Sequence, residues 1–345
     1  MGVIKILSSK GWFRIEEYND ALRKHRFKSY ESNDKPMTIK NPKANKLQGK
    51  AVSILTHMRC FGMVIEPLVK DIEDKVLDFA FQLLELTERL MASEYREFEI
   101  EILEQHVIDY LDSRQKIYDE FPALLGTPKP KHHYMCHYGE AIRKFGPPLC
   151  YWTGRYESKH RIAKGTVESS KNFVNITSTL AVRQQMRLAS KYYSGFCDTS
   201  VVHMPETVTK KSDLNDDSDV GTELKRFLGE NDVLCKEIIF HGQLYKIGDL
   251  TVLKANDRST LEVGVIKAIV VKEGKVSFLS RKYIVSRNHL NYFVTEARSD
   301  ELNFCDPKHL SDFKPLIKYG TDMKFKFYIH HHISYDISDM QFYQS

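Results

Sequence analysis

The arrangement of apolar residues changes once along this chain, and that change limits the folds open to it. Up to about residue 193, apolar residues recur at three- and four-residue steps, the spacing of one helix face. From residue 233 they form short runs rich in Val, Ile, Tyr and Phe, separated by Gly and Asn or Asp, which is typical of antiparallel strands. The sequence therefore predicts an α+β protein, with a mainly α-helical N-terminal domain followed by a small antiparallel β-barrel or sandwich.

The periodic segments predict individual elements. Two long helices, over about 72–90 and 95–118, are expected to pack as an antiparallel pair. A third is expected from Asn172 to Tyr193, with its inward face made of Phe173, Ile176, Leu180 and Leu188. In the β-rich part, Glu273-Gly274 is the expected corner of a hairpin.

The length of 345 residues predicts roughly two domains. We expect a helical domain over 1–195 and a β-rich domain over 233–345. Between them, residues 196–232 contain the polar run TKKSDLNDDSDVGTE, which has no apolar periodicity and predicts an acidic flexible linker.

Charge is spread unevenly. The whole chain carries a formal +5, but residues 124–194 hold 12 Lys and Arg against 3 Asp and Glu. A local positive excess attracts phosphate backbones, which makes DNA the expected partner, although a solvated helical face explains the same pattern. No apolar run is long enough to cross a bilayer, so no membrane association is expected. Six scattered cysteines without a C-x-x-C pair favour reduced thiols in the cytoplasm or nucleus.

Five of these 12 basic residues lie in PKHHYMCHYGEAIRKFGPPLCYWTGRYESKH, from Pro130 to His160, and six more follow it. Basic residues alternate with aromatic ones there, a combination that suits backbone neutralisation and base stacking. The expected nucleic-acid contacts are Lys129, Lys131, Arg143, Lys144, Arg155, Lys159, Arg161, Lys164 and Lys171. The competing interpretation places Trp152, Tyr156 and Phe145 in the core, and we favour burial for Trp152.

The same stretch offers two pairs of metal ligands. His133 and His137 are four residues apart and Glu157 and His160 three apart, so each pair lies on one face if the segment is helical. No H-E-x-x-H motif accompanies them, and a histidine pair is more often a polar contact than a ligand set. Cys136 adjoins His137, but sequence neighbours on a helix do not face each other, which argues against a thiolate nucleophile.

The residues from Pro130 to Arg183 closely resemble a motif of uncharacterised transposon-encoded proteins of animals. GWFRIEEYNDALRKHRFKSYESNDKP, KLQGKAVSILTHMRCF and the β-rich tail FHGQLYKIGDLTVL resemble other parts of the same family, so the resemblance covers nearly the whole chain. Plant CACTA-type transposases are more distantly similar.

The resemblance implies descent from a DDE-type transposase with a ribonuclease-H-like core interrupted by helices. By that analogy Glu157 is the third acidic residue of the active site, and Glu157 and His160 are the candidate metal ligands. The family's segment with an earlier acid has no counterpart here, so the chain is expected to correspond to a C-terminal portion. The first acidic residues are not identified, so the interpretation leans against transposase activity in this chain alone. No cofactor is expected, and Mg or Mn would serve only a complete site.

Two alternatives remain open. One is a metal-dependent nuclease or strand transferase that uses Glu157 with two further acids. The other is a non-enzymatic protein or chromatin interaction module, in which an exposed aromatic cage of the β-rich domain does the binding. A homo-oligomer is a further possible assembly.

Overall fold

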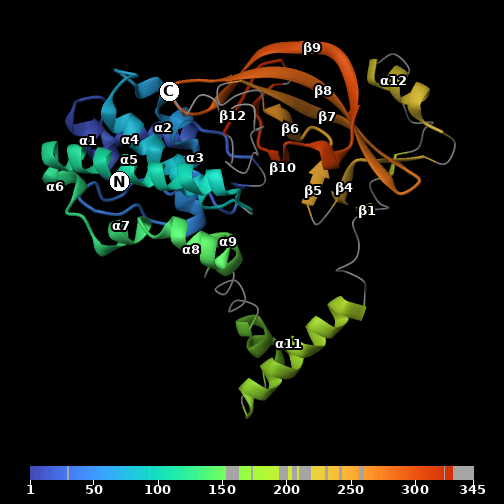
Figure 1. The fold of residues 1–345 in the computed structure, drawn as a ribbon, viewed down its shortest axis with the longest axis horizontal. Helices are drawn as coiled ribbons and strands as arrows, with labels where there is room; N and C mark the ends of the chain where they lie inside the picture. Colours follow the sequence, from blue (N-terminus) through green and yellow to red (C-terminus); the bar gives the residue numbers. More distant parts are fainter. Residues whose placement is uncertain are drawn as a thin grey trace.

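The computed structural model joins a helical N-terminal part to a β-rich C-terminal part (Figure 1). It describes residues 1–28, 31–92, 94–152, 163–171, 174–193, 201–203, 208–209, 219–229, 232–240, 243–255, 260–321 and 323–328. The predicted α+β layout, with helices first and antiparallel strands second, is confirmed.

The helical part packs around one apolar core. Its elements are α1 (Gly2–Ser9), α2 (Ile15–Lys24), α3 (Ala51–Ile65), the 3₁₀ turn η2 (Glu66–Leu68), α4 (Lys75–Arg89), α5 (Glu97–Glu120), α6 (Pro122–Leu125), α7 (Pro130–Met135), α8 (Tyr138–Phe145) and α9 (Pro148–Tyr151).

The predicted antiparallel pair is α4 and α5. Phe79 of α4 stacks on Tyr110 of α5 with ring centroids 5.2 Å apart. Lys75 at the start of α4 pairs with Glu120 at the end of α5, which fixes the antiparallel direction. Helix α4 begins at Lys75, three residues after the start that the apolar pattern predicts. The Asp74 carboxylate accepts the Val76 N–H and caps the first turn there.

The third long helix, α11 (Ile176–Tyr193), lies away from the other labelled elements in Figure 1. Residues 163–170 form a helix beside it. Ile176 and Leu180 are half-buried, but Leu188 is exposed, so its predicted inward position is wrong. The helical spacing alone does not say whether another element covers a face.

The β-rich part contains two sheets. Its strands are β1 (Val201–His203), β2 (Val208–Thr209), β3 (Val233–Cys235), β4 (Glu237–Phe240), β5 (Gln243–Lys246), β6 (Leu250–Ala255), β7 (Thr260–Lys272), β8 (Lys275–Arg287), β9 (Phe293–Cys305), β10 (Asp312–Leu316), β11 (Tyr319–Gly320) and β12 (Phe325–Phe327).

The large sheet has the order β10-β6-β7-β8-β9-β12-β11, with β3 pairing the far end of β7 and β2 pairing β3. Its centre is the β7–β8 hairpin, whose corner is the predicted Glu273-Gly274. Both residues have positive φ, 48° and 78°, as a two-residue hairpin turn requires. Strands β1, β4 and β5 form the smaller sheet.

Of the two predicted forms, a β-barrel or a sandwich, the described strands do not form a closed barrel. Among the described strands, β10 and β11 end the path of the large sheet without pairing with each other. The smaller sheet instead packs on the large one, where Ile238 and Tyr245 share a core with Ile269 and Phe278.

The segment expected as a flexible acidic linker contains regular structure. Strands β1 and β2 pair with strands of the β-rich part, and α12 (Asp219–Phe227) packs on its large sheet. Phe227 stacks on Phe304 with ring centroids 3.7 Å apart, and Asp219 pairs with Arg281. The sequence did not predict α12, because the segment is mostly polar and acidic and the helix has few apolar residues.

The two parts share a core. Leu290 and Tyr292, in the turn between β8 and β9, are buried within the apolar core of the helical part. Fully burying a side chain such as Leu290 stabilises the folded state by about 1.5–3 kcal/mol. Gly62 of α3 admits this turn, since a Cβ atom there would lie 1.9 Å from the Leu290 carbonyl oxygen.

Candidate nucleic-acid interface

Helix α8 is held on α5 by a close contact. Gly139 faces Glu104, and a Cβ atom at Gly139 would lie 1.9 Å from the Glu104 Oε1 atom. Ile142, one turn further, is buried in the helical core. The buried face of α8 is therefore fixed, and the opposite face, with Lys144, is left exposed.

Arg143, expected to contact nucleic acid, is engaged within the protein. Its guanidinium donates to Glu97 at 2.5 Å and to both oxygens of Glu104 at 2.6 and 3.0 Å. These hydrogen bonds lower the pKa of the Glu104 carboxyl and raise that of the Arg143 guanidinium. Because two carboxylates already neutralise its charge, Arg143 anchors α8 rather than offering a free cation.

A sharp corner follows α8. Gly146 has φ 77° and ψ −167°, a conformation open almost only to glycine, and its N–H closes the helix on the Ile142 carbonyl at 2.8 Å. Pro148 then begins α9, where its fixed φ suits the first turn. The corner brings Phe145 at the end of α8 near Tyr151 at the end of α9, with ring centroids 6.5 Å apart.

Three aromatic side chains at this corner are exposed, and we call Phe145, Tyr151 and Trp152 the aromatic ledge. Phe145 is 65% exposed, Tyr151 42% and Trp152 39%. The favoured burial of Trp152 is therefore wrong, and Phe145, which the competing interpretation also placed in the core, is exposed as well. Helix α9 is a single short turn, and among the described residues no element covers these two side chains fully. The Lys144 ammonium lies 5.3 Å from the Phe145 ring centroid, within cation–π range.

Apart from Arg143, the predicted basic contacts fall into three groups. Lys129, Lys131 and Lys144 have exposed side chains on the segment that carries the ledge. Lys164 and Lys171 are also exposed but belong to the separate segment that leads to α11. The remaining predicted contacts, Arg155, Lys159 and Arg161, and the aromatic Tyr156, lie outside the described residues.

The predicted catalytic and metal residues, Glu157 and His160, also lie outside the described residues. Within the described part of the chain, no three His, Cys, Asp or Glu side chains converge as metal ligands. Cys136 and Cys150 are exposed free thiols, and the other described cysteines are free as well.

A buried polar contact in the helical core had no signal in the sequence. The Tyr18 hydroxyl lies 2.6 Å from His57 Nε2, and both side chains are buried. Burial lowers the pKa of His57 to about 4 and raises those of Tyr18 and Cys60. A protonated Tyr18 phenol and a neutral His57 ring share this hydrogen bond without burying a charge, so the pair stabilises the core.

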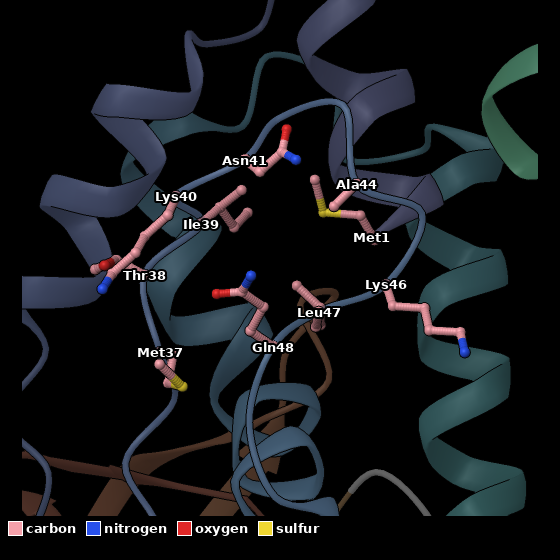
Figure 2. A pocket seen from close by; sticks show the side chains of 10 residues that line it. All are labelled: Met1, Met37, Thr38, Ile39, Lys40, Asn41, Ala44, Lys46, Leu47 and Gln48. Atoms are coloured by element: carbon pink, nitrogen blue, oxygen red, sulfur yellow. The ribbon is translucent and has the colours of Figure 1, made fainter.

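A small pocket lies beside α1, under the connector of residues 37–48 (Figure 2). Its lining is Met1, Met37, Thr38, Ile39, Lys40, Asn41, Ala44, Lys46, Leu47 and Gln48. This lining has no carboxylate, histidine or thiol, and its polar side chains are those of Thr38, Lys40, Asn41, Lys46 and Gln48.

The β-rich part offers no aromatic cage among its described side chains. The Phe and Tyr side chains between 219 and 328 that the structure describes are buried or half-buried, and Tyr245, Phe278 and Phe325 are among the most enclosed. Recognition by an exposed cage needs open ring faces, so this observation counts against that interpretation.

Comparisons with protein-family models, curated proteins and solved structures found no match for this chain. Among the described helices, none combines the length and the apolar character needed to cross a membrane.

Proposed function

We propose that this protein contacts nucleic acid through the surface formed by α7, α8 and α9. The observation that carries the proposal is the aromatic ledge beside exposed lysines. A positively charged groove with open ring faces suits backbone contact and base stacking, whereas a solvated helical face has no need of exposed Phe and Trp side chains.

The excess of basic residues over 124–194 supports this proposal, since a local charge of this size favours phosphate binding. Arg143 does not contribute, because Glu97 and Glu104 already neutralise it. Among the described residues of this surface, the exposed lysines are Lys129, Lys131 and Lys144. We therefore expect stacking by the ledge to supply a large share of the affinity.

The resemblance of Pro130–Arg183 to transposon-encoded proteins supports descent from a DDE-type transposase. We propose that the helical part is what remains of an interrupted ribonuclease-H-like core and that it lacks a complete set of catalytic acids. The β-rich part then serves as an accessory to the nucleic-acid-contacting helical part.

The test is binding of fluorescent oligothymidylate and of a mixed-sequence duplex by the full chain at several salt concentrations. We expect log K to fall linearly with log salt. Trp152→Ala and Phe145→Ala should each weaken binding to the single strand by about 1–3 kcal/mol, the value of one stacked base. Met323→Ala removes an exposed apolar side chain of the β-rich part and should change nothing.

A salt slope near zero would remove the proposed contact with nucleic acid. Unchanged affinity in both ledge variants, with a normal salt slope, would leave charge as the only determinant and reject stacking.

A further inference from the structure

The histidine pair of the basic segment has the geometry of a chelate. The Nε2 atoms of His133 and His137 lie 3.3 Å apart. Two nitrogens that each bind an ion at about 2.0–2.1 Å, at a tetrahedral angle, are separated by roughly 3.3–3.4 Å. One small divalent ion therefore fits between them without a change in the backbone.

The turn between α7 and α8 sets this separation. The His137 N–H donates to the Tyr134 carbonyl at 3.2 Å, and the His137 carbonyl accepts the Ala141 N–H at 3.0 Å. Helix α7 ends at Met135 and α8 begins at Tyr138, and the Cys136 N–H also donates to the His133 carbonyl at 3.1 Å. This hydrogen-bonded turn brings the His133 and His137 rings together, with centroids 5.0 Å apart. The two rings are nearly perpendicular, at 86°, and both side chains are exposed, so an ion can reach both lone pairs from solvent.

The neighbouring histidine has a different task. His132 Nδ1 accepts the Lys129 N–H at 2.8 Å and so completes the first turn of α7. His132 is half-buried and stabilises the start of the helix that carries His133. Substitution of His132 is therefore the matched control, because it removes a histidine of α7 that does not belong to the pair.

We propose that His133 and His137 form a two-histidine site for a divalent ion of borderline softness, such as Zn²⁺, Ni²⁺ or Cu²⁺. Imidazole nitrogens prefer these ions, whereas Mg²⁺ and Ca²⁺ prefer oxygen ligands. No third His, Cys, Asp or Glu of the described residues joins the pair. Within the described part of the chain, the other coordination positions are therefore open to water or to a donor from a bound molecule.

Chelation requires both Nε2 atoms as acceptors of the metal, with the ring protons on Nδ1. When both rings are neutral, the 3.3 Å contact is one Nε2–H donating to the other Nε2. Binding replaces that hydrogen bond with two metal–nitrogen bonds, and the displaced proton moves to Nδ1 of the same ring. The site does not depend on the proposed contact with nucleic acid, and its test uses the metal alone.

The experiment is a calorimetric titration of the full chain with Zn²⁺ and Ni²⁺, with Mg²⁺ as the negative probe. We expect one strongest site per chain for Zn²⁺ and Ni²⁺ and no comparable heat with Mg²⁺. His133→Asn and His137→Asn should each lower the affinity by more than about tenfold, because losing a ligand costs more than losing an outer-shell partner, which costs roughly 10–100-fold.

His132→Asn and the exposed His289→Asn should keep the site, and circular dichroism checks that each variant stays folded. Electron paramagnetic resonance of bound Cu²⁺ gives a second readout, in which we expect hyperfine structure from two equivalent nitrogens in the parent and from one in either pair variant. Unchanged affinity and stoichiometry in both pair variants, or no binding by the parent at millimolar metal, would overturn the proposal.

Discussion

The hydroxyl of Tyr328 donates a hydrogen bond of 2.6 Å to the Glu31 carboxylate, although the two residues are 297 positions apart. Tyr319 donates to the same oxygen at 2.6 Å, and Glu31 is only 5% exposed. The connector that follows α2 and carries Glu31 is thus bound by the last described residues of the β-rich part. A buried carboxylate needs such donors, so the helical and β-rich parts depend on each other for stability.

Tyr328→Phe should destabilise the protein by about 1.5–3 kcal/mol, the usual contribution of a hydrogen bond to a charged group. Urea unfolding followed by tryptophan fluorescence and by circular dichroism measures this loss. Tyr193→Phe changes a tyrosine that is 92% exposed and should have no effect. Equal stability of the two variants would mean that the Glu31 contact contributes nothing.

Gly62→Ala should disrupt the joint between the two parts. The added methyl group would lie 1.9 Å from the Leu290 carbonyl oxygen, and that atom belongs to the backbone and cannot turn aside. Overpacking of this kind typically costs about 1–3 kcal/mol, and the shifted turn also withdraws Tyr292 from the core. The observable is the free energy of unfolding in urea.

Gly165→Ala is the matched control for that substitution. Gly165 lies in the helix of residues 163–170, and a Cβ atom there meets nothing within 4 Å. Alanine is the better helix former, so this variant should be neutral or more stable by up to about 1 kcal/mol. Equal losses in both variants would contradict the role assigned to the close contact of Gly62 and Leu290.

The acid sensitivity of the protein should depend on His57. Burial lowers its pKa to about 4. The unfolded chain binds a proton near pH 6.5, which the folded protein does not accept until about pH 4. Unfolding therefore becomes easier as the pH falls through this window, by about 3 kcal/mol for this one group.

His57→Gln keeps a polar partner for Tyr18 and removes the titration. The difference in unfolding free energy between the parent and this variant should shrink from pH 7 to pH 4. His25, whose pKa burial also lowers, is present in both proteins and cancels in the difference. His289→Gln alters an exposed histidine and should give a curve parallel to the parent's. Parallel curves for His57→Gln as well would reject the assignment.

Local patterns predicted what depends on near neighbours in the chain. The apolar spacing of α4 and α5 and the Glu273-Gly274 corner each record a requirement of the backbone within a few residues. The burial of Leu290 in the helical core could not be read this way, because the partner, Gly62, is remote in the sequence and has no side chain to signal a contact.

The candidate interface was predicted in outline and revised in detail. The basic and aromatic composition indicated the segment, but not which side chains are free. Arg143 is taken up by acids 39 and 46 positions earlier, and the exposure of Trp152 depends on whether another element covers α9. Both outcomes depend on tertiary packing, and the spacing of residues along one helix does not reveal contacts with remote parts of the chain.

Arg143 and Lys144 are adjacent in sequence, and the structure assigns them opposite roles. Arg143 secures α8 on α5 through Glu97 and Glu104, whereas Lys144 is exposed beside the aromatic ledge. Arg143→Ala should therefore speed amide hydrogen exchange in α8 and leave the salt dependence of nucleic-acid binding near that of the parent. Lys144→Ala should leave exchange in α8 unchanged and reduce the slope of log K against log salt by about one, the value for a lost phosphate contact. If Arg143→Ala lowers that slope as much as Lys144→Ala does, the guanidinium is available to phosphate and its assignment as an internal anchor is wrong.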